Sequence, residues 1–221
     1  PKFQQAARGY LDQAKAVYTA AKDKYEALYK TFETFIDPDK DKKRYEEREV
    51  ALVNFIQAQL NLAITTYEQA QTYDRSEPKF AEILKQAADE FEAINIKYRS
   101  QVAGLYGRMW QGKCFEEIGN FQSALGIYDE LLGHPGESPV MKRLQNKVLH
   151  FKLVCLNTDQ RKDYQLVIDL AQEWLKANTK FQRSREGLGI RWEASRASEL
   201  LADREETAAG DKEKLYRQSL T

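Results

Sequence analysis

The sequence predicts an all-α protein. Apolar residues recur at intervals of three and four through every long segment, which is the spacing of one face of a helix. The five prolines, at positions 1, 38, 78, 135 and 139, all lie at breaks between these segments. A helical chain requires this placement, because proline removes a backbone donor and clashes with the preceding turn. No segment alternates with period two for long enough to form a strand.

The first two expected helices form a long antiparallel hairpin. The first runs from 3 to 35 with one apolar stripe, and Ile36-Asp37-Pro38 ends it. The second runs from about Tyr45 to Tyr73 and carries two neighbouring apolar rows, so we expect it to contact more than one neighbour. Its segment from Val50 to Tyr67 has no charge, yet Asn and Gln side chains interrupt it. Such polar side chains are costly in the hydrocarbon interior of a membrane, which favours a water-soluble helix over a membrane span.

The helices that follow are shorter and lie at closer intervals. Ser76-Glu77-Pro78 and Ser138-Pro139 are start signals, each with a capping serine before a proline in the first turn. The expected helices are Lys79–Tyr98, Ser100–Ile118, Phe121–Leu132, Pro139–Asn157, Asp163–Ala177 and Lys180–Leu201, with a short one at Lys212–Ser219. We divide the chain into the hairpin with the third helix (1–99), shorter helix pairs (100–203) and a polar tail (204–221), expected to form one continuous solenoid.

Composition excludes several classes of protein. The 221 residues carry 34 Lys and Arg and 34 Asp and Glu, so the formal net charge is zero. This balance argues against a general nucleic-acid or anionic-membrane binder. The content of 42% apolar and 31% charged residues is that of a globular chain. The two cysteines, Cys114 and Cys155, exclude a disulfide scaffold; we expect both to be buried, and whether they pair is left open.

One stretch, 105–136, has the residue pattern of a helix–turn–helix repeat. It places small residues where two helices would cross, aromatic rings in the wedge between them, and a glycine in the tight turn. These residues are Gly112, Phe115, Gly119, Phe121, Ala124, Leu125 and Tyr128. In this spacing the stretch resembles a tetratricopeptide repeat, a unit of about 34 residues. A second unit around Cys155 to Ala171 matches less closely, because its turn lacks the glycine.

The resemblance implies a non-enzymatic scaffold for protein–protein interaction. In this family, stacked helix pairs line a concave surface with the first helix of each unit, and that surface holds a peptide or a partner helix. The family's concave positions fall on Tyr106, Met109, Lys113, Glu116, Leu149, Lys152 and Leu156. An apolar strip flanked by two lysines suits an amphipathic or weakly acidic segment. The carboxylate clamp of chaperone-binding members is not carried over, because Met109 and Leu156 stand where it needs polar groups.

Two other functions stay open. The hairpin from 3 to 73 would mediate self-association, or would extend from a larger bacterial envelope protein built of helical repeats. An enzyme domain would need a base, a nucleophile and an orienting group together. The chain offers only His134 and His150, and it has no HExxH, CxxC or glycine-rich phosphate loop. We therefore expect no enzyme activity, cofactor, metal or nucleic-acid partner.

We interpret the three tryptophans and two of the glycines first as residues with a structural role. Trp110, Trp174 and Trp192 each stand among apolar neighbours, so core packing is expected for all three. An aromatic platform for a ligand is the alternative, and Trp110 is its best candidate. Gly187 and Gly189 fall within a helical pattern, so we expect them to mark close helix packing and not phosphate binding.

The chain begins Pro1-Lys2-Phe3 without an initiator methionine, so we interpret it as a processed form or a fragment. If a signal peptide preceded it, the protein is exported to the periplasm; otherwise it is cytoplasmic.

Overall fold

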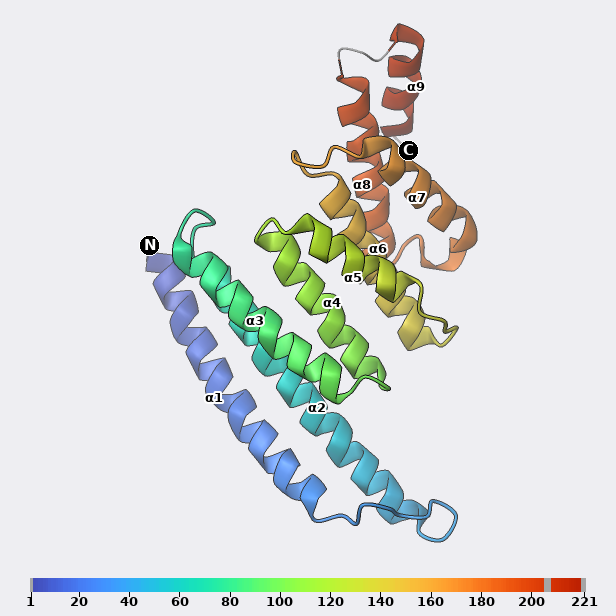
Figure 1. Cartoon of the computed structure of the whole chain (residues 1–221). Coiled ribbons are helices and arrows are strands. Elements are labelled where there is room, and N and C mark those ends of the chain that lie inside the picture. The colour runs from blue at the N-terminus through green and yellow to red at the C-terminus, as the bar shows by residue number, and fades with distance from the viewer. Residues whose placement is uncertain (1, 205–207, 220–221) are drawn as a thin grey trace. The chain divides into compact units, whose positions relative to one another are not determined.

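A computed structural model describes residues 2–204 and 208–219, and within these ranges it contains helices and turns but no strand. The predicted all-α class is confirmed. The chain divides into two compact units, residues 1–120 (unit 1) and 121–221 (unit 2), which we describe separately (Figure 1). The expected division at 99/100 falls inside unit 1, because the helices on either side of it pack together. Among the described residues, no helix combines the length and hydropathy of a membrane span.

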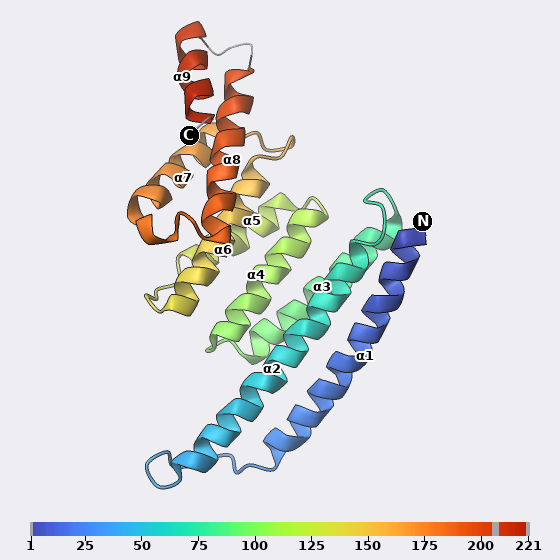
Figure 2. The ribbon, with the colours of Figure 1, turned by 180° about the vertical axis from the view of Figure 1, so that it is seen from behind.

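Unit 1 is built around its second helix. Its described helices are α1 (Lys2–Lys30), α2 (Lys42–Ala70), α3 (Pro78–Lys97) and α4 (Val102–Glu117). Figures 1 and 2 show α1 running along α2, and α2 also packs against α3 and α4. The core therefore lies between α2, α3 and α4, whereas none of the described α1 residues is fully buried. The expected wide apolar face of the second helix is confirmed.

Local hydrogen bonds set where the helices of unit 1 begin. Asp41 caps α2 by accepting a bond from the Arg44 backbone N–H at 3.1 Å. The expectation that Ser76 caps α3 is wrong, because Glu77 occupies the cap position. The Glu77 carboxylate instead accepts from the Asp74 backbone N–H at 2.8 Å and closes the preceding turn.

Unit 2 contains α5 (Phe121–Leu132), α6 (Pro139–Leu156), α7 (Tyr164–Ala177), α8 (Arg185–Ala202) and α9 (Ala209–Ser219). α6 packs against α5, α7 and α8, and α8 also packs against α7 and α9. Ser138 caps α6 as predicted, accepting from the Met141 N–H at 3.2 Å. α8 begins later than expected, because Ser184 caps it by accepting from the Gly187 N–H at 3.0 Å. Of the expected tail at 204–221, residues 205–207 and 220–221 lie outside the described residues.

In the repeat-like stretch the structure confirms the burial of two residues and the turn, whereas the two helices expected to pair, α4 and α5, belong to different units. Ala124 and Tyr128 are fully buried. Gly119 has φ +82°, the left-handed backbone that its turn requires. In the less similar unit, Lys162 adopts φ +54° in place of a glycine. Phe121 is only half-buried, so its ring fills less of the interior than expected.

We expect Ala124→Leu to lower the free energy of unfolding by about 1–3 kcal/mol, because the fully buried site has no room for a larger side chain. Phe121→Ala is expected to cost less than the roughly 3–5 kcal/mol typical of a fully buried ring, since Phe121 is only partly buried. Urea unfolding followed by circular dichroism measures both variants. An unchanged midpoint for Ala124→Leu would contradict the packing described for α5.

Close packing explains the two glycines of α8, as predicted. A Cβ atom on Gly187 would overlap the carbonyl oxygen of Phe181. A Cβ atom on Gly189 would lie 2.6 Å from the His150 ring, at the contact between α6 and α8. Any larger residue at these positions would push its neighbours apart.

Candidate interaction surface

Four of the predicted binding residues lie on α4, and the structure exposes none of them. Tyr106 is half-buried and packs against the core of unit 1. Met109 is fully buried, so its expected place on an open surface is wrong. Lys113 and Glu116 are largely buried and form an ion pair with 2.5 Å between Nζ and Oε1.

The Lys113 ammonium joins a charge network inside unit 1. Its Nζ also lies 2.9 Å from Oε1 of Glu117, whose Oε2 accepts from the Arg75 guanidinium at 2.7 Å. The Tyr67 hydroxyl donates to Glu117 at 3.3 Å. Burial alone would lower the pKa of Lys113, but Glu116 and Glu117 outweigh it and the pKa is raised. Burial and the Glu117 charge raise the pKa of Tyr67. We interpret the network as structural, because these charges compensate one another.

The other three predicted residues lie on α6, and here too the apolar ones are buried. Leu149 and Leu156 belong to the core cluster of unit 2, so the prediction of an open apolar strip is wrong for them as well. The reason is that α5, α7 and α8 all pack against α6 and cover its apolar sides. Lys152 is mostly covered and pairs with Asp129, with 2.6 Å between Nζ and Oδ1.

The histidines, cysteines and acidic side chains of the described residues form no metal-binding cluster. No group of three or more His, Cys, Asp and Glu side chains in these residues is placed to hold a metal ion. His150 packs against Gly189, and both cysteines are buried free thiols. Burial raises the pKa of Cys114, which keeps it protonated and unreactive at neutral pH.

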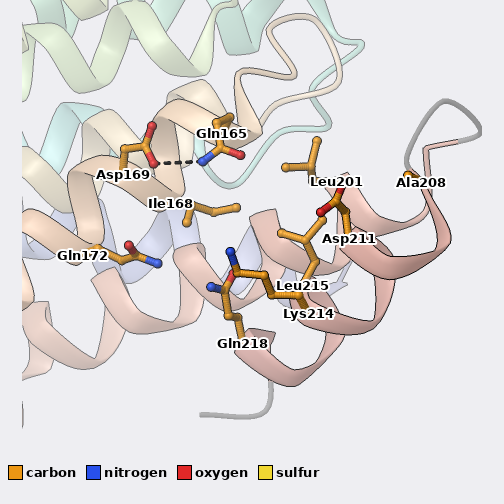
Figure 3. A pocket seen from close by; sticks show the side chains of 10 residues that line it. All are labelled: Gln165, Ile168, Asp169, Gln172, Leu201, Ala208, Asp211, Lys214, Leu215 and Gln218. Carbon is orange, nitrogen blue, oxygen red and sulfur yellow. Dashed lines mark hydrogen bonds between the residues drawn. The ribbon is translucent and has the colours of Figure 1, made fainter.

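A cleft of about 570 Å³ lies in unit 2 between α7, the end of α8, and α9 (Figure 3). Ile168, Leu201 and Leu215 supply its apolar lining. The other lining residues are Gln165, Asp169, Gln172, Ala208, Asp211, Lys214 and Gln218. Gln165 donates to Asp169 at 2.8 Å, as drawn in Figure 3. No histidine, cysteine or serine stands among these lining residues.

The three tryptophans have different surroundings. Trp110 lies against the rings of Tyr67 and Phe91, with centroid distances of 5.1 and 5.9 Å. Trp174 is buried, and its indole N–H donates to Asn146 at 2.9 Å. Core packing is therefore confirmed for these two. It is wrong for Trp192 on α8, which is 68% exposed.

Trp192 is the centre of an apolar and basic surface on α8. Leu188, one helical turn earlier, is 54% exposed, so the two side chains share one side of the helix. Arg185, Arg191 and Arg196 are exposed around them. We call these five residues the tryptophan patch. Its side of α8 remains open because α6, α7 and α9 cover the buried residues of the helix.

Positive charge dominates at the tryptophan patch. Its exposed acidic neighbour along the helix is Glu199, whereas Glu193 is buried and accepts from the Asn157 amide at 2.8 Å. The Nη1 atom of Arg196 lies 3.7 Å from Oε2 of Glu193. On the adjoining helix α6, burial lowers the pKa of Lys147, while Glu186 raises it by more than Arg185 lowers it. The patch thus combines an exposed indole with a surplus of cations.

The sequence contains a signal for this surface, which the expectation that tryptophans pack in the core did not take into account. Ile190 and Ala197 mark the buried side of α8, and Trp192 falls outside their three-to-four spacing. Arginines precede and follow the Leu188–Trp192 pair at short intervals. An apolar pair set among arginines is typical of a binding surface, not of a core.

Comparisons with models of protein families, with curated proteins and with solved structures find no significant match to this chain. The resemblance to tetratricopeptide repeats therefore rests on the residues of 105–136 and stays a prediction.

Proposed function

We propose that the protein is a non-enzymatic scaffold that binds an acidic, amphipathic segment of a partner protein at the tryptophan patch. The observation that carries this proposal is the exposure of Trp192 beside Leu188, within a group of exposed arginines. Tryptophan and arginine are the residues most enriched where interfaces concentrate their binding energy. The proposal keeps the class of function expected from the sequence and moves the site from α4 and α6 to α8.

The chemistry of the patch selects the kind of partner. Leu188 and Trp192, one turn apart, would pack against apolar side chains that are also one turn apart on a partner helix. Arg185 and Arg196 lie at the edge and would pair with carboxylates flanking that apolar pair. Rim charges of this kind speed association and suppress wrong partners more than they add affinity. A basic segment would bring like charges together and would bind worse.

We expect the patch to bind a synthetic helical peptide of roughly 15 residues that carries leucines on one face and glutamates on its flanks. Isothermal titration calorimetry measures its affinity at low salt. Trp192→Ala should weaken binding at least tenfold, which corresponds to about 1.4 kcal/mol. The matched control is Leu166→Ala, which removes an exposed leucine on α7 outside the patch and should leave the affinity unchanged.

A charge reversal tests the electrostatic half of the proposal. The double variant Arg185→Glu/Arg196→Glu should prefer the same peptide with lysines in place of its glutamates. Circular dichroism confirms that each variant folds. Equal affinity of wild type and Trp192→Ala for the glutamate peptide, or wild-type preference for the lysine peptide, would contradict the proposed site.

A further inference from the structure

A groove runs between α7 and α8 in unit 2, and α9 covers part of its length. The cleft of about 570 Å³ drawn in Figure 3 is one part of this groove, and a second cleft of about 330 Å³ is the other. Ile168, Gln172 and Gln218 line both clefts, so the two are continuous. In the second cleft, Leu175 and Ala194 add to the apolar lining.

The described part of α9 runs back along α8 and ends over the middle of the groove. The Ser195 hydroxyl donates to the carbonyl oxygen of Ser219, the last residue of α9. Leu201 lines the first cleft, and Ala194, two turns earlier on α8, lines the second. The first cleft therefore lies beside α9, whereas the second extends past Ser195 toward the start of α8. The groove is longer than the helix that occupies it.

α9 is held to the groove by little packing. None of its described residues is fully buried, whereas α7 buries Ile168 and Trp174 among others. Leu215 is partly buried and packs against the core of unit 2. The Tyr216 hydroxyl donates to Asp203 at 2.6 Å, but this bond is exposed to water. A helix of 11 residues is too short to be stable by itself, so α9 depends on these contacts and opens at low cost.

The part of α9 that lies over the groove shows which chemistry the groove accepts. Figure 3 shows Lys214 and Leu215 of α9 reaching into the first cleft, which Ile168 and Asp169 of α7 line from the other side. The leucine adds to the apolar lining, and the lysine carries the charge opposite to that of Asp169. In the second cleft the charged residue of α8 is Arg191. The groove thus offers an apolar floor with a negative charge in one cleft and a positive charge in the other.

We propose that the groove between α7 and α8 binds an amphipathic helix of a partner protein, and that α9 occupies part of this site until the partner displaces it. The partner helix carries leucines along one side, a basic residue near Asp169 and an acidic residue near Arg191. It displaces α9 because it fills both clefts. Leu188 and Trp192 do not line this groove, so its occupancy is independent of the proposed function of the tryptophan patch.

Hydrogen–deuterium exchange on the 221-residue chain tests whether α9 opens by itself. We expect the amides of α9 to exchange about a hundredfold faster than those in the middle of α7 and α8, because α9 opens while the rest of unit 2 stays folded. Tyr216→Phe removes the bond to Asp203 and should speed exchange in α9 further. The matched control is Tyr10→Phe on α1, which should change nothing in unit 2. Protection of α9 equal to that of α8 would overturn α9 as a displaceable occupant.

Fluorescence anisotropy of a labelled synthetic peptide tests the site. The peptide has about 18 residues, with the sequence of α9 followed by residues that extend its leucine-bearing side and end in a glutamate. Leu215→Glu in the full chain removes the apolar contact of α9 and should raise the affinity for this peptide about tenfold, because a tethered helix competes at a high effective concentration. The matched control, Leu166→Glu, puts the same charge on an exposed side of α7 and should bind the peptide like wild type.

Two further substitutions in the Leu215→Glu chain locate the bound peptide. Gln172→Arg places a long charged side chain at both clefts and should lower the affinity about tenfold, whereas Trp192→Ala should leave it unchanged. Circular dichroism confirms that each variant folds. Equal affinity of wild type and Leu215→Glu, or no loss with Gln172→Arg, would overturn the groove as the site. A loss with Trp192→Ala would place the peptide at the tryptophan patch, which overturns the groove and leaves the proposed function standing.

Discussion

Lys113→Met is expected to lower the free energy of unfolding by about 3–5 kcal/mol at pH 7. The substitution keeps the aliphatic length of the side chain and removes only its charge. Glu116 and Glu117, which lie 2.5 and 2.9 Å from Nζ, would then remain largely buried without this cation. Removing one partner of a buried ion pair is costly because the remaining charge has already left water. Urea unfolding at pH 7 measures the loss.

Lys152→Met is the matched control, since Lys152 pairs with an exposed carboxylate, Asp129. An exposed partner returns to water, so this loss should stay within about 1 kcal/mol. The pH dependence has a definite sign. The folded-state pKa of Lys113 lies above its ordinary value of 10.5. Its stabilisation is therefore complete below pH 10.5 and is lost as the pH rises through the folded-state pKa. Equal losses for the two variants at pH 7 would show that the network of Lys113 is not buried as described.

Asn157→Asp should have an effect of similar size in unit 2. Asn157 is fully buried, and its amide donates to the carbonyl oxygen of Glu193 at 2.9 Å and to its carboxylate at 2.8 Å. An introduced carboxylate would remove both donors and would place a second negative charge against Glu193. We expect a loss of about 3–5 kcal/mol at pH 7, as for other uncompensated buried charges.

Asn157→Ala separates the charge effect from the loss of the hydrogen bonds. It removes the two donors without adding a charge and should cost about 1–3 kcal/mol. The repulsion in Asn157→Asp raises the pKa of the introduced carboxyl group, so its extra cost should shrink as the pH falls and that group becomes protonated. Thermal unfolding between pH 4 and pH 7 measures the difference, in a range set by the ordinary carboxyl pKa of about 4. Equal stability of the two variants at pH 7 would contradict the buried contact with Glu193.

The sequence by itself determined the class of fold and many local features. Apolar periodicity, prolines and helix caps involve only residues that are close together in the chain, so they can be recognised from the sequence without a structure. The cap at Ser138, the left-handed turn at Gly119 and the close packing at Gly187 and Gly189 were all predictable in this way. The cap expected at Ser76 is wrong, because Glu77 occupies the cap position.

Only the tertiary structure decided which apolar side chains are surface and which are core. A helix shows its apolar side in the sequence, but the neighbours that cover it come from distant segments. Met109 and Leu149 were expected on an open surface and are buried, with α5, α7 and α8 around Leu149's helix. Trp192 was expected in the core and is exposed, because α6, α7 and α9 lie along the other sides of α8. Exposure depends on these long-range contacts, and the sequence pattern of a single helix does not contain them.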